Sequence, residues 1–144
     1  MGILNRIVLS TAPWMPKIVI GRIASVYVAG NKLEDGIDLV RKLNKKGFVG
    51  TLDLLGEEVK NRRGITKTTN SYCDLIDGIA NSGVDCNISL KLTAIGLKVD
   101  ESLCWDNLSV ILDKAKMYNT FVRMDMEDSE VTESTIKMLS LIHI

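Results

Sequence analysis

The sequence predicts an α/β fold: a partial (β/α)8 TIM-like barrel of about three strand–helix units, preceded by an N-terminal helical extension. Three strand-like segments each precede a helical segment, and each starts roughly 35 residues after the last, as βαβ units do. Right-handed crossovers make such strands parallel. Apolar and polar residues alternate along these strands, whereas strands covered by helices on both faces are apolar throughout. A barrel explains the alternation, because only its outer face meets helices.

The first helix and strand are predicted at the start of this alternation. Asn31 can cap a helix, with Glu34 in the capping-box position. Lys45 and Lys46 followed by Gly47 form a good helix end. A strand is predicted next over residues 48–54, and the stretch GEEVKNRRG after it reads as a polar loop.

The later elements follow the same order. Strands are predicted over residues 86–93 and 120–126, and helices over about 68–82, after the capping residue Asp100, and from Ser129. The residues expected to face the core from these helices are Tyr72, Leu75, Ile76, Ile79 and Ala80; Cys104, Leu108, Ile111, Leu112 and Ala115; and Val131, Thr135, Met138 and Ile142.

Charged residues gather on one face of the predicted strands. Asp53, Lys91 and Asp125 occupy odd-numbered positions at or near the carboxyl ends of three different strands. In a barrel they converge on the opening where catalytic residues lie, so we expect a ligand site there. Arg123, one layer deeper, is interpreted as a structural ion-pair partner. The alternative is an ion-pair network that stabilises the interior and has no chemical role.

Composition narrows the class of protein. The chain has 144 residues, 18 Lys+Arg and 18 Asp+Glu, and 46% hydrophobic residues, which suits one domain with a substantial core. The zero net charge argues against a nucleic-acid surface. The three cysteines are odd in number, have apolar neighbours and form no CxxC motif, which favours buried, reduced thiols over a reactive or paired one. The only histidine, His143, stands one residue from the end of the sequence, which argues against a histidine-based triad or a multi-histidine metal site within this chain, and no metal is expected.

The first 30 residues differ from the rest because they contain no acidic residue. Lys17 and Arg22 interrupt their apolar runs, so a transmembrane span is not expected. We interpret residues 1–30 as a helical extension and residues 31–144 as the barrel portion. An organelle-targeting peptide and an amphipathic membrane-surface segment remain alternatives.

Three stretches, taken together, resemble a known family. They are YVAGNKLEDGIDLVRKLNKKGFVGTLDLLGEEV, NISLKLTAIGL and FVRMDMED, within residues 27–136. In this order and spacing they resemble the start of monofunctional proline dehydrogenases. That resemblance implies a distorted (β/α)8 barrel that holds FAD and oxidises L-proline to 1-pyrroline-5-carboxylate. It also implies that electrons pass on to a membrane quinone.

The resemblance extends to single residues. Lys91 matches the family lysine that meets the substrate close to the flavin, and Asp125 matches an active-site aspartate; both are expected to be catalytic. Met126 matches a position that contacts FAD. Asp53 matches a family aspartate whose role stays open. The implied location is cytoplasmic, at the inner membrane face, or mitochondrial in a eukaryote, and the oligomeric state is left open.

The sequence departs from the family in its extent. The later barrel strands and an arginine pair for the proline carboxylate have no counterpart, so we expect a fragment that binds FAD weakly or not at all and has no turnover. Two other functions stay open. One is a Schiff-base aldolase-like barrel that uses Lys91. The other is a non-catalytic α/β binding module in which Lys91 and Asp125 merely pair.

Overall fold

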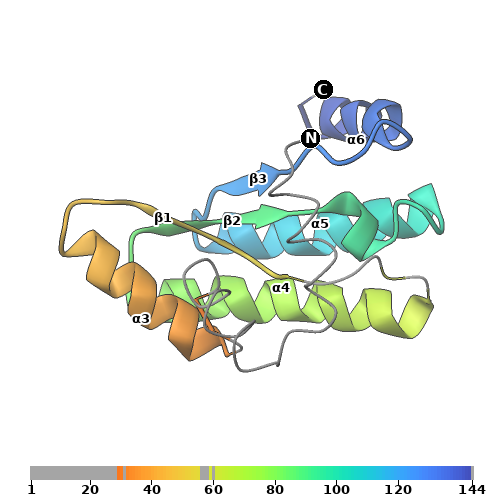
Figure 1. Cartoon of the computed structure of the whole chain (residues 1–144). Helices are drawn as coiled ribbons and strands as arrows, with labels where there is room; N and C mark the ends of the chain where they lie inside the picture. The colour runs from red at the N-terminus through yellow and green to blue at the C-terminus, as the bar shows by residue number, and fades with distance from the viewer. Residues whose placement is uncertain (1–28, 31, 56–58, 60, 144) are drawn as a thin grey trace, which may run out of the picture. The chain divides into compact units, whose positions relative to one another are not determined.

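The computed structural model describes residues 29–30, 32–55, 59 and 61–143 (Figure 1). The chain divides into two compact units, residues 1–36 and 37–144. Helix α3 (Leu33–Asn44) crosses the boundary between them. The predicted extension over residues 1–30 lies almost wholly outside the described residues, as does the predicted helix cap Asn31.

A parallel sheet forms the centre of the second unit. Its strands are β1 (Gly50–Asp53), β2 (Cys86–Leu90) and β3 (Val122–Met124), in the order β1-β2-β3. Thr51 pairs with Asn87, and Ile88 pairs with Val122. The predicted parallel arrangement of three consecutive strands is therefore confirmed among the described residues.

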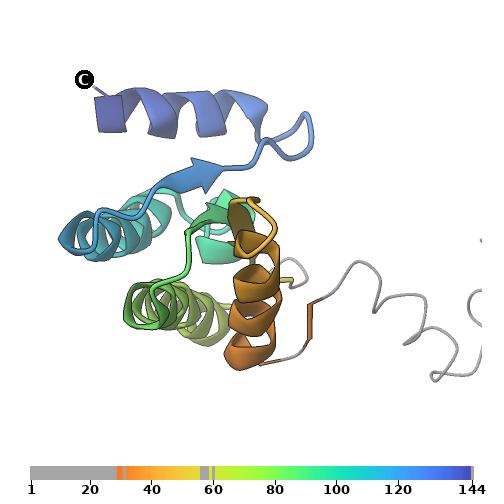
Figure 2. The ribbon, with the colours of Figure 1, turned by 90° about the vertical axis from the view of Figure 1, so that its left-hand side faces the viewer.

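Two long helices cover one face of this sheet. Helix α4 (Arg62–Ser82) joins β1 to β2, and α5 (Glu101–Met117) joins β2 to β3; both lie on the same side of the strands (Figure 2). Helix α6 (Thr132–His143) follows β3. The core between sheet and helices is made of fully buried side chains, among them Ile65, Ile76, Ile88, Leu90, Leu108 and Ile111.

The alternation predicted for the strands is clearest in β2. Ile88 and Leu90 are completely buried on the helical side. Ser89, between them, faces the other way, and its hydroxyl reaches the carboxylate of Asp125. On the adjoining strands, Thr51 and Arg123 are exposed. The sheet thus has an apolar face under the helices and a polar face opposite.

The second strand ends earlier than predicted. It stops at Leu90, and Leu92–Ile95 form a 3-10 helix, η2. The apolar residues that made this segment read as strand are buried as the chain turns. Gly96 closes the turn with φ 120°, a conformation that suits a residue without a side chain. Lys91 therefore stands between a strand and a helix rather than within a strand.

Helix α4 starts six residues earlier than predicted, within the stretch read as a polar loop. Asn61 caps it, and its side chain accepts a hydrogen bond from Gly64 N at 2.8 Å. The hydroxyl of Thr69 donates to the carbonyl of Ile65 at 3.0 Å, so this buried hydroxyl is hydrogen-bonded within the helix. Ile65 is fully buried and fixes this first turn to the core.

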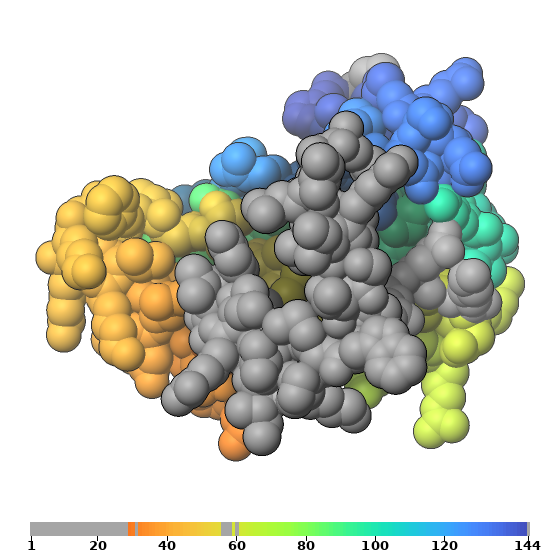
Figure 3. Space-filling view, in the orientation of Figure 1, coloured from red at the N-terminus to blue at the C-terminus, as the bar shows by residue number. Residues whose placement is uncertain are grey.

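The remaining boundaries differ by a few residues. Phe48 and Phe121, predicted within strands, precede β1 and β3 and are largely exposed. Helix α6 begins at Thr132 rather than Ser129. Lys98 Nζ lies 2.9 Å from Asp128 Oδ2, so the segment after η2 adjoins the loop after β3, as the space-filling view shows (Figure 3). None of the described helices is long and apolar enough to cross a membrane.

Candidate active site at the strand ends

The carboxyl ends of the three strands bring the predicted site residues together. Asp53 is the last residue of β1, and Lys91 follows β2 with an extended backbone. Asp125 follows β3, and its N–H donates to the carbonyl of Leu90 at 2.9 Å. This bond continues the parallel ladder by one step and places Asp125 beside Lys91.

The ammonium of Lys91 lies between the two carboxylates. Its Nζ donates to Asp53 Oδ2 and to Asp125 Oδ2, the latter at 3.0 Å. The side chains of Lys91, Asp53 and Asp125 are 35%, 24% and 32% exposed, so the cluster is partly desolvated and still open to a ligand. Two negative charges and one positive charge leave it with a net charge of minus one.

Two neutral hydroxyl groups complete the cluster. Tyr72, which is fully buried on α4, donates from its OH to Asp53 Oδ1 at 3.3 Å. Ser89 on β2 donates from Oγ to Asp125 Oδ1. Each of the four carboxylate oxygens therefore accepts one hydrogen bond, and Lys91 provides two of them.

The hydrogen bonds set the protonation of the cluster. The hydrogen bond to Asp53, and then the one to Asp125, raise the pKa of Lys91 although desolvation opposes this. Burial alone would raise the pKa of Asp125, but the hydrogen bonds from Ser89 and Lys91 outweigh it and the pKa is lowered. Burial, and secondly the charge of Asp53, raise the pKa of Tyr72. At neutral pH Lys91 is therefore an ammonium, Asp125 a carboxylate and Tyr72 a protonated phenol.

This protonation bears on the chemistry available to Lys91. An imine-forming lysine must lose its proton, and such lysines have depressed pKa values. Lys91 has a raised pKa, so the geometry disfavours the Schiff-base alternative. Of its three N–H groups, two are used within the described residues, and the third can donate to an anionic acceptor.

The residues around the cluster have different surroundings. Met126 is 57% exposed next to Asp125. Glu127 accepts hydrogen bonds from Thr93 N at 3.1 Å and from Thr93 Oγ1.

The interpretation of Arg123 as an ion-pair partner is wrong: it is exposed, and among the described residues it forms no ion pair. No group of acidic, histidine or cysteine side chains in the described ranges could hold a metal.

Two members of the cluster were not identified as site residues from the sequence. The helical spacing predicts Tyr72 as a core residue, and Ser89 is not among the residues predicted for the site. A signal for Tyr72 exists, because a buried tyrosine hydroxyl normally has a hydrogen-bond partner. That signal gives no direction, however, since nothing in the sequence tells which carboxylate the hydroxyl reaches.

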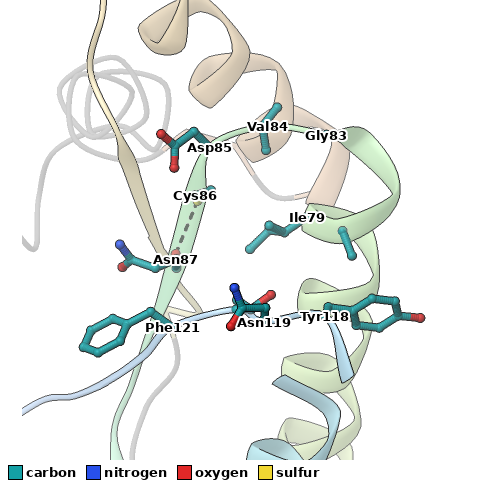
Figure 4. A pocket seen from close by; sticks show the side chains of 11 residues that line it. Ile79, Gly83, Val84, Asp85, Cys86, Asn87, Tyr118, Asn119 and Phe121 are labelled. Carbon is teal, nitrogen blue, oxygen red and sulfur yellow. Dashed lines mark hydrogen bonds between the residues drawn. The ribbon is translucent and has the colours of Figure 1, made fainter. Parts of the chain in front are cut away.

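A separate pocket lies at the other end of the sheet, at the amino ends of β2 and β3 (Figure 4). It has a volume of about 390 Å³, and its lining includes Asp85, Cys86, Asn87, Tyr118 and Phe121. None of the predicted site residues lines it. The candidate site is therefore the strand-end cluster and not this pocket.

Comparisons with known proteins agree with the predicted family and fold. The family model described as "Proline dehydrogenase" matches residues 37–143. The chain is 36% identical over 112 residues to proline dehydrogenase 1 of Bacillus subtilis subsp. natto, covering 78% of this chain and 37% of that protein. It is 33% identical over 118 residues to proline dehydrogenase of Deinococcus radiodurans, covering 80% of this chain and 38% of that protein.

A solved structure extends the likeness to the fold. Proline utilization A from Bdellovibrio bacteriovorus, in a form inactivated by N-propargylglycine, superposes with a TM-score of 0.81 at 19% sequence identity. The match covers 88% of this chain and 16% of that one. The chain thus spans less than half the length of these relatives.

Proposed function

The chain belongs to the proline dehydrogenase family, and we propose that its strand-end cluster takes part in the FAD-dependent oxidation of L-proline to 1-pyrroline-5-carboxylate. The observation that carries this proposal is the Lys91 ammonium, shared by Asp53 and Asp125 at the carboxyl ends of parallel strands. Binding and catalytic groups of barrel enzymes occupy this end of the strands.

In this proposal Lys91 binds the substrate and also contributes to catalysis. Its third N–H donates to the substrate carboxylate, a charge-assisted hydrogen bond between an ammonium and an anion. Because its pKa is raised, Lys91 keeps its proton and acts as a fixed positive charge rather than as a base. Asp125 is proposed as the second catalytic residue, since it holds Lys91 and adds a negative charge beside the reacting amine.

The cofactor enters the proposal through the family, whose members are flavin-dependent, and we assign it as FAD. The residues present fit such a group, since an exposed Met126 can give apolar contact next to the Lys91 cation. When bound, FAD supplies the two-electron oxidation of the substrate. The chain's own contribution is to hold the substrate and to stabilise negative charge near the flavin.

The electron acceptor and location follow from the same assignment. We propose that a quinone at a membrane surface accepts the electrons. The protein would then be cytoplasmic or peripheral to the inner membrane, and mitochondrial in a eukaryote.

The competing function is a binding module in which the cluster only stabilises the fold. In that case Lys91 and Asp125 could be replaced together by apolar residues of similar volume without loss of any ligand, and with neutral or improved stability. The proposed function predicts the opposite for ligand binding, because the ammonium itself is the ligand's partner.

A segment exchange tests the proposal. Residues 37–143 would replace the matching segment of the Bacillus subtilis proline dehydrogenase 1, and the chimera would be assayed for flavin content and proline-dependent dye reduction. We expect bound flavin and measurable turnover. A folded chimera that binds flavin but does not oxidise proline would contradict the proposed function, and the unmodified parent enzyme provides the reference activity.

A further inference from the structure

The two hydroxyl groups of the cluster occupy equivalent places on its two sides. Tyr72 OH donates to the outer oxygen of Asp53, and Ser89 Oγ donates to the outer oxygen of Asp125. The inner oxygen of each carboxylate accepts from Lys91. A carboxylate with a donor on each oxygen cannot rotate without breaking a hydrogen bond.

Tyr72 reaches this position from behind the sheet. It belongs to α4, its side chain is completely buried, and its ring lies in the apolar core. Its hydroxyl donates to the Asp53 carboxylate at 3.3 Å. Core packing therefore holds the Tyr72 ring in place, and the ring in turn holds its hydroxyl against the Asp53 carboxylate.

Ser89 is held equally firmly. It lies in the middle of the central strand, and only 6% of its surface is exposed. Its neighbours in the ladder are Asp53 on one side and Arg123 on the other. A strand residue in this setting has little freedom beyond rotation of its hydroxyl, so Ser89 presents a fixed donor to Asp125.

We infer that Tyr72 and Ser89 are positioning residues, which orient Asp53 and Asp125 so that Lys91 keeps one N–H directed at the ligand. They touch neither substrate nor cofactor and act through the carboxylates. Without these two hydroxyl groups, the carboxylates of Asp53 and Asp125 can rotate. The Lys91 ammonium, which is hydrogen-bonded to both carboxylates, then loses its fixed orientation. The inference rests on the proposed function only for what the third N–H binds.

The raised pKa of Tyr72 supports this role. Burial and the charge of Asp53 keep the phenol protonated. Tyr72 therefore remains a protonated donor at neutral pH and does not act as a base there. Ser89, a neutral alcohol, is also a constant donor.

Hydrogen exchange of the Lys91 ammonium protons, followed by heteronuclear NMR on the whole 144-residue chain, tests the inference without turnover. Tyr72→Phe and Ser89→Ala each remove one hydroxyl. We expect each to speed exchange of the Lys91 ammonium about tenfold, the order expected for losing one hydrogen bond to a charged group. Ser89→Thr, which keeps a hydroxyl, should restore slow exchange.

Matched controls separate positioning from general loosening. Tyr118→Phe removes a phenol hydroxyl at the end of α5, and Ser109→Ala removes a helix hydroxyl that bonds the carbonyl of Trp105. Both should leave exchange at Lys91 unchanged. If Tyr72→Phe does not fold, the Ser89 variants decide. Wild-type exchange in Ser89→Ala, or equal acceleration in the controls, would overturn the inference.

A kinetic measurement in the chimera links the geometry to the proposed function. Ser89→Ala should lower kcat/KM for proline about tenfold while flavin content stays at the parent level. The NMR result decides on positioning even if the chimera does not oxidise proline. Failure of the proposed function and failure of this inference are therefore distinguishable.

Discussion

At the scale of single residues, the arrangement around Lys91 limits what the site can do. Two carboxylates with outer donors hold an ammonium, and the cluster keeps one surplus negative charge. Such a site tolerates an anionic ligand only where the ammonium is directed at it. Each member of the cluster therefore has a measurable effect on Lys91.

Asp53→Asn should lower the pKa of Lys91. The hydrogen bond to Asp53 is the largest cause of the raised value, and an amide offers the same shape without the charge. An NMR titration of the Lys91 side chain measures the change. Asp106→Asn, at an exposed position on α5, is the control and should leave the titration unchanged. An unaltered Lys91 titration in Asp53→Asn would contradict the assigned hydrogen bonding.

Lys91→Met should destabilise the chain most at pH values between 3.8, the ordinary pKa of an aspartate, and 10.5, the ordinary pKa of a lysine. Because folding lowers the pKa of Asp125, this group contributes stability that is present above pH 3.8. That stability is lost as the pH falls through the pKa of Asp125 in the folded state. Because folding raises the pKa of Lys91, this group contributes stability that is present below pH 10.5. That stability is lost as the pH rises through the pKa of Lys91 in the folded state.

Urea unfolding of the wild type and Lys91→Met across pH measures this difference. The gap in free energy of unfolding should narrow at both extremes. A gap that does not depend on pH would mean that the lysine contributes by packing of its stem alone.

The sequence identified the charged members of this cluster but not the neutral ones. Lys91, Asp53 and Asp125 could be predicted to meet, because strand parity and strand ends place them on one edge. Tyr72 could not, because its position in the helical stripe is fully explained by core packing. Its hydroxyl reaches Asp53 only through the packing of α4 against the sheet, which no local pattern encodes.

At the scale of elements, the helix starts determine where the strand ends lie. Helix α4 follows β1 in the chain, and Asn61 caps its first turn. The cap fixes the register of the helix, and this register brings Tyr72 to Asp53. Loss of the cap should therefore be felt both in stability and at the site.

Asn61→Ala should lower the free energy of unfolding by about 1 kcal/mol, the usual cost of losing an N-cap side chain. The bond lost is the one from Gly64 N to Asn61 Oδ1 at 2.8 Å. Denaturant unfolding measures the change. Asn70→Ala, at an exposed position within the same helix, is the control and should be neutral or stabilising. Equal behaviour of the two variants would contradict the cap.

Element boundaries show where sequence reasoning fails. The cap at Asp100 was predicted, and its side chain accepts from Ser102 N and Leu103 N. The start of α4 was missed because Gly64 and the threonines after it have low helix propensity. The end of β2 was missed because buried apolar residues of the 3-10 turn look like strand. In both cases tertiary burial overrides local preference.

At the scale of the whole molecule, the core between the sheet and the α4–α5 layer protects its interior thiol. Cys104 on α5 is completely buried, and burial raises its pKa to about 12. Cys86 is half-buried, and burial raises its pKa to about 11. The expectation of buried thiols is therefore correct for Cys104 and wrong for Cys73 and Cys86, which are only partly buried.

At about pH 8, alkylation of Cys104 in the native chain should be at least about a hundredfold slower than in the unfolded chain. Because Cys104 is completely buried in the core, its alkylation rate should follow global unfolding. Mass spectrometry with increasing urea measures the rate, with Cys73 and Cys86 as internal comparisons. Early modification of Cys104, before the other two, would contradict the packing of α5 against the sheet.

The fold class and the family could be predicted from the sequence as a whole. Alternating polarity along the strands indicated the barrel-type sheet, and the strings around Asp53, Lys91 and Asp125 indicated the family, which the model match over residues 37–143 confirms. The ligand roles of these residues stay predictions. These roles depend on the substrate and cofactor that bind at the polar face of the sheet, and the pattern of residues within the chain does not specify those ligands.

The most direct test is anaerobic flavin reduction in the chimera that carries residues 37–143. Mixing with L-proline should bleach the flavin absorbance, and Lys91→Met should slow this bleaching roughly a hundredfold, the usual cost of losing one well-placed catalytic donor. Lys137→Met, which removes a surface lysine paired with Glu101, should bleach at the unmodified rate. Unchanged bleaching in a folded, flavin-loaded Lys91→Met chimera would contradict the assignment of Lys91 to the substrate.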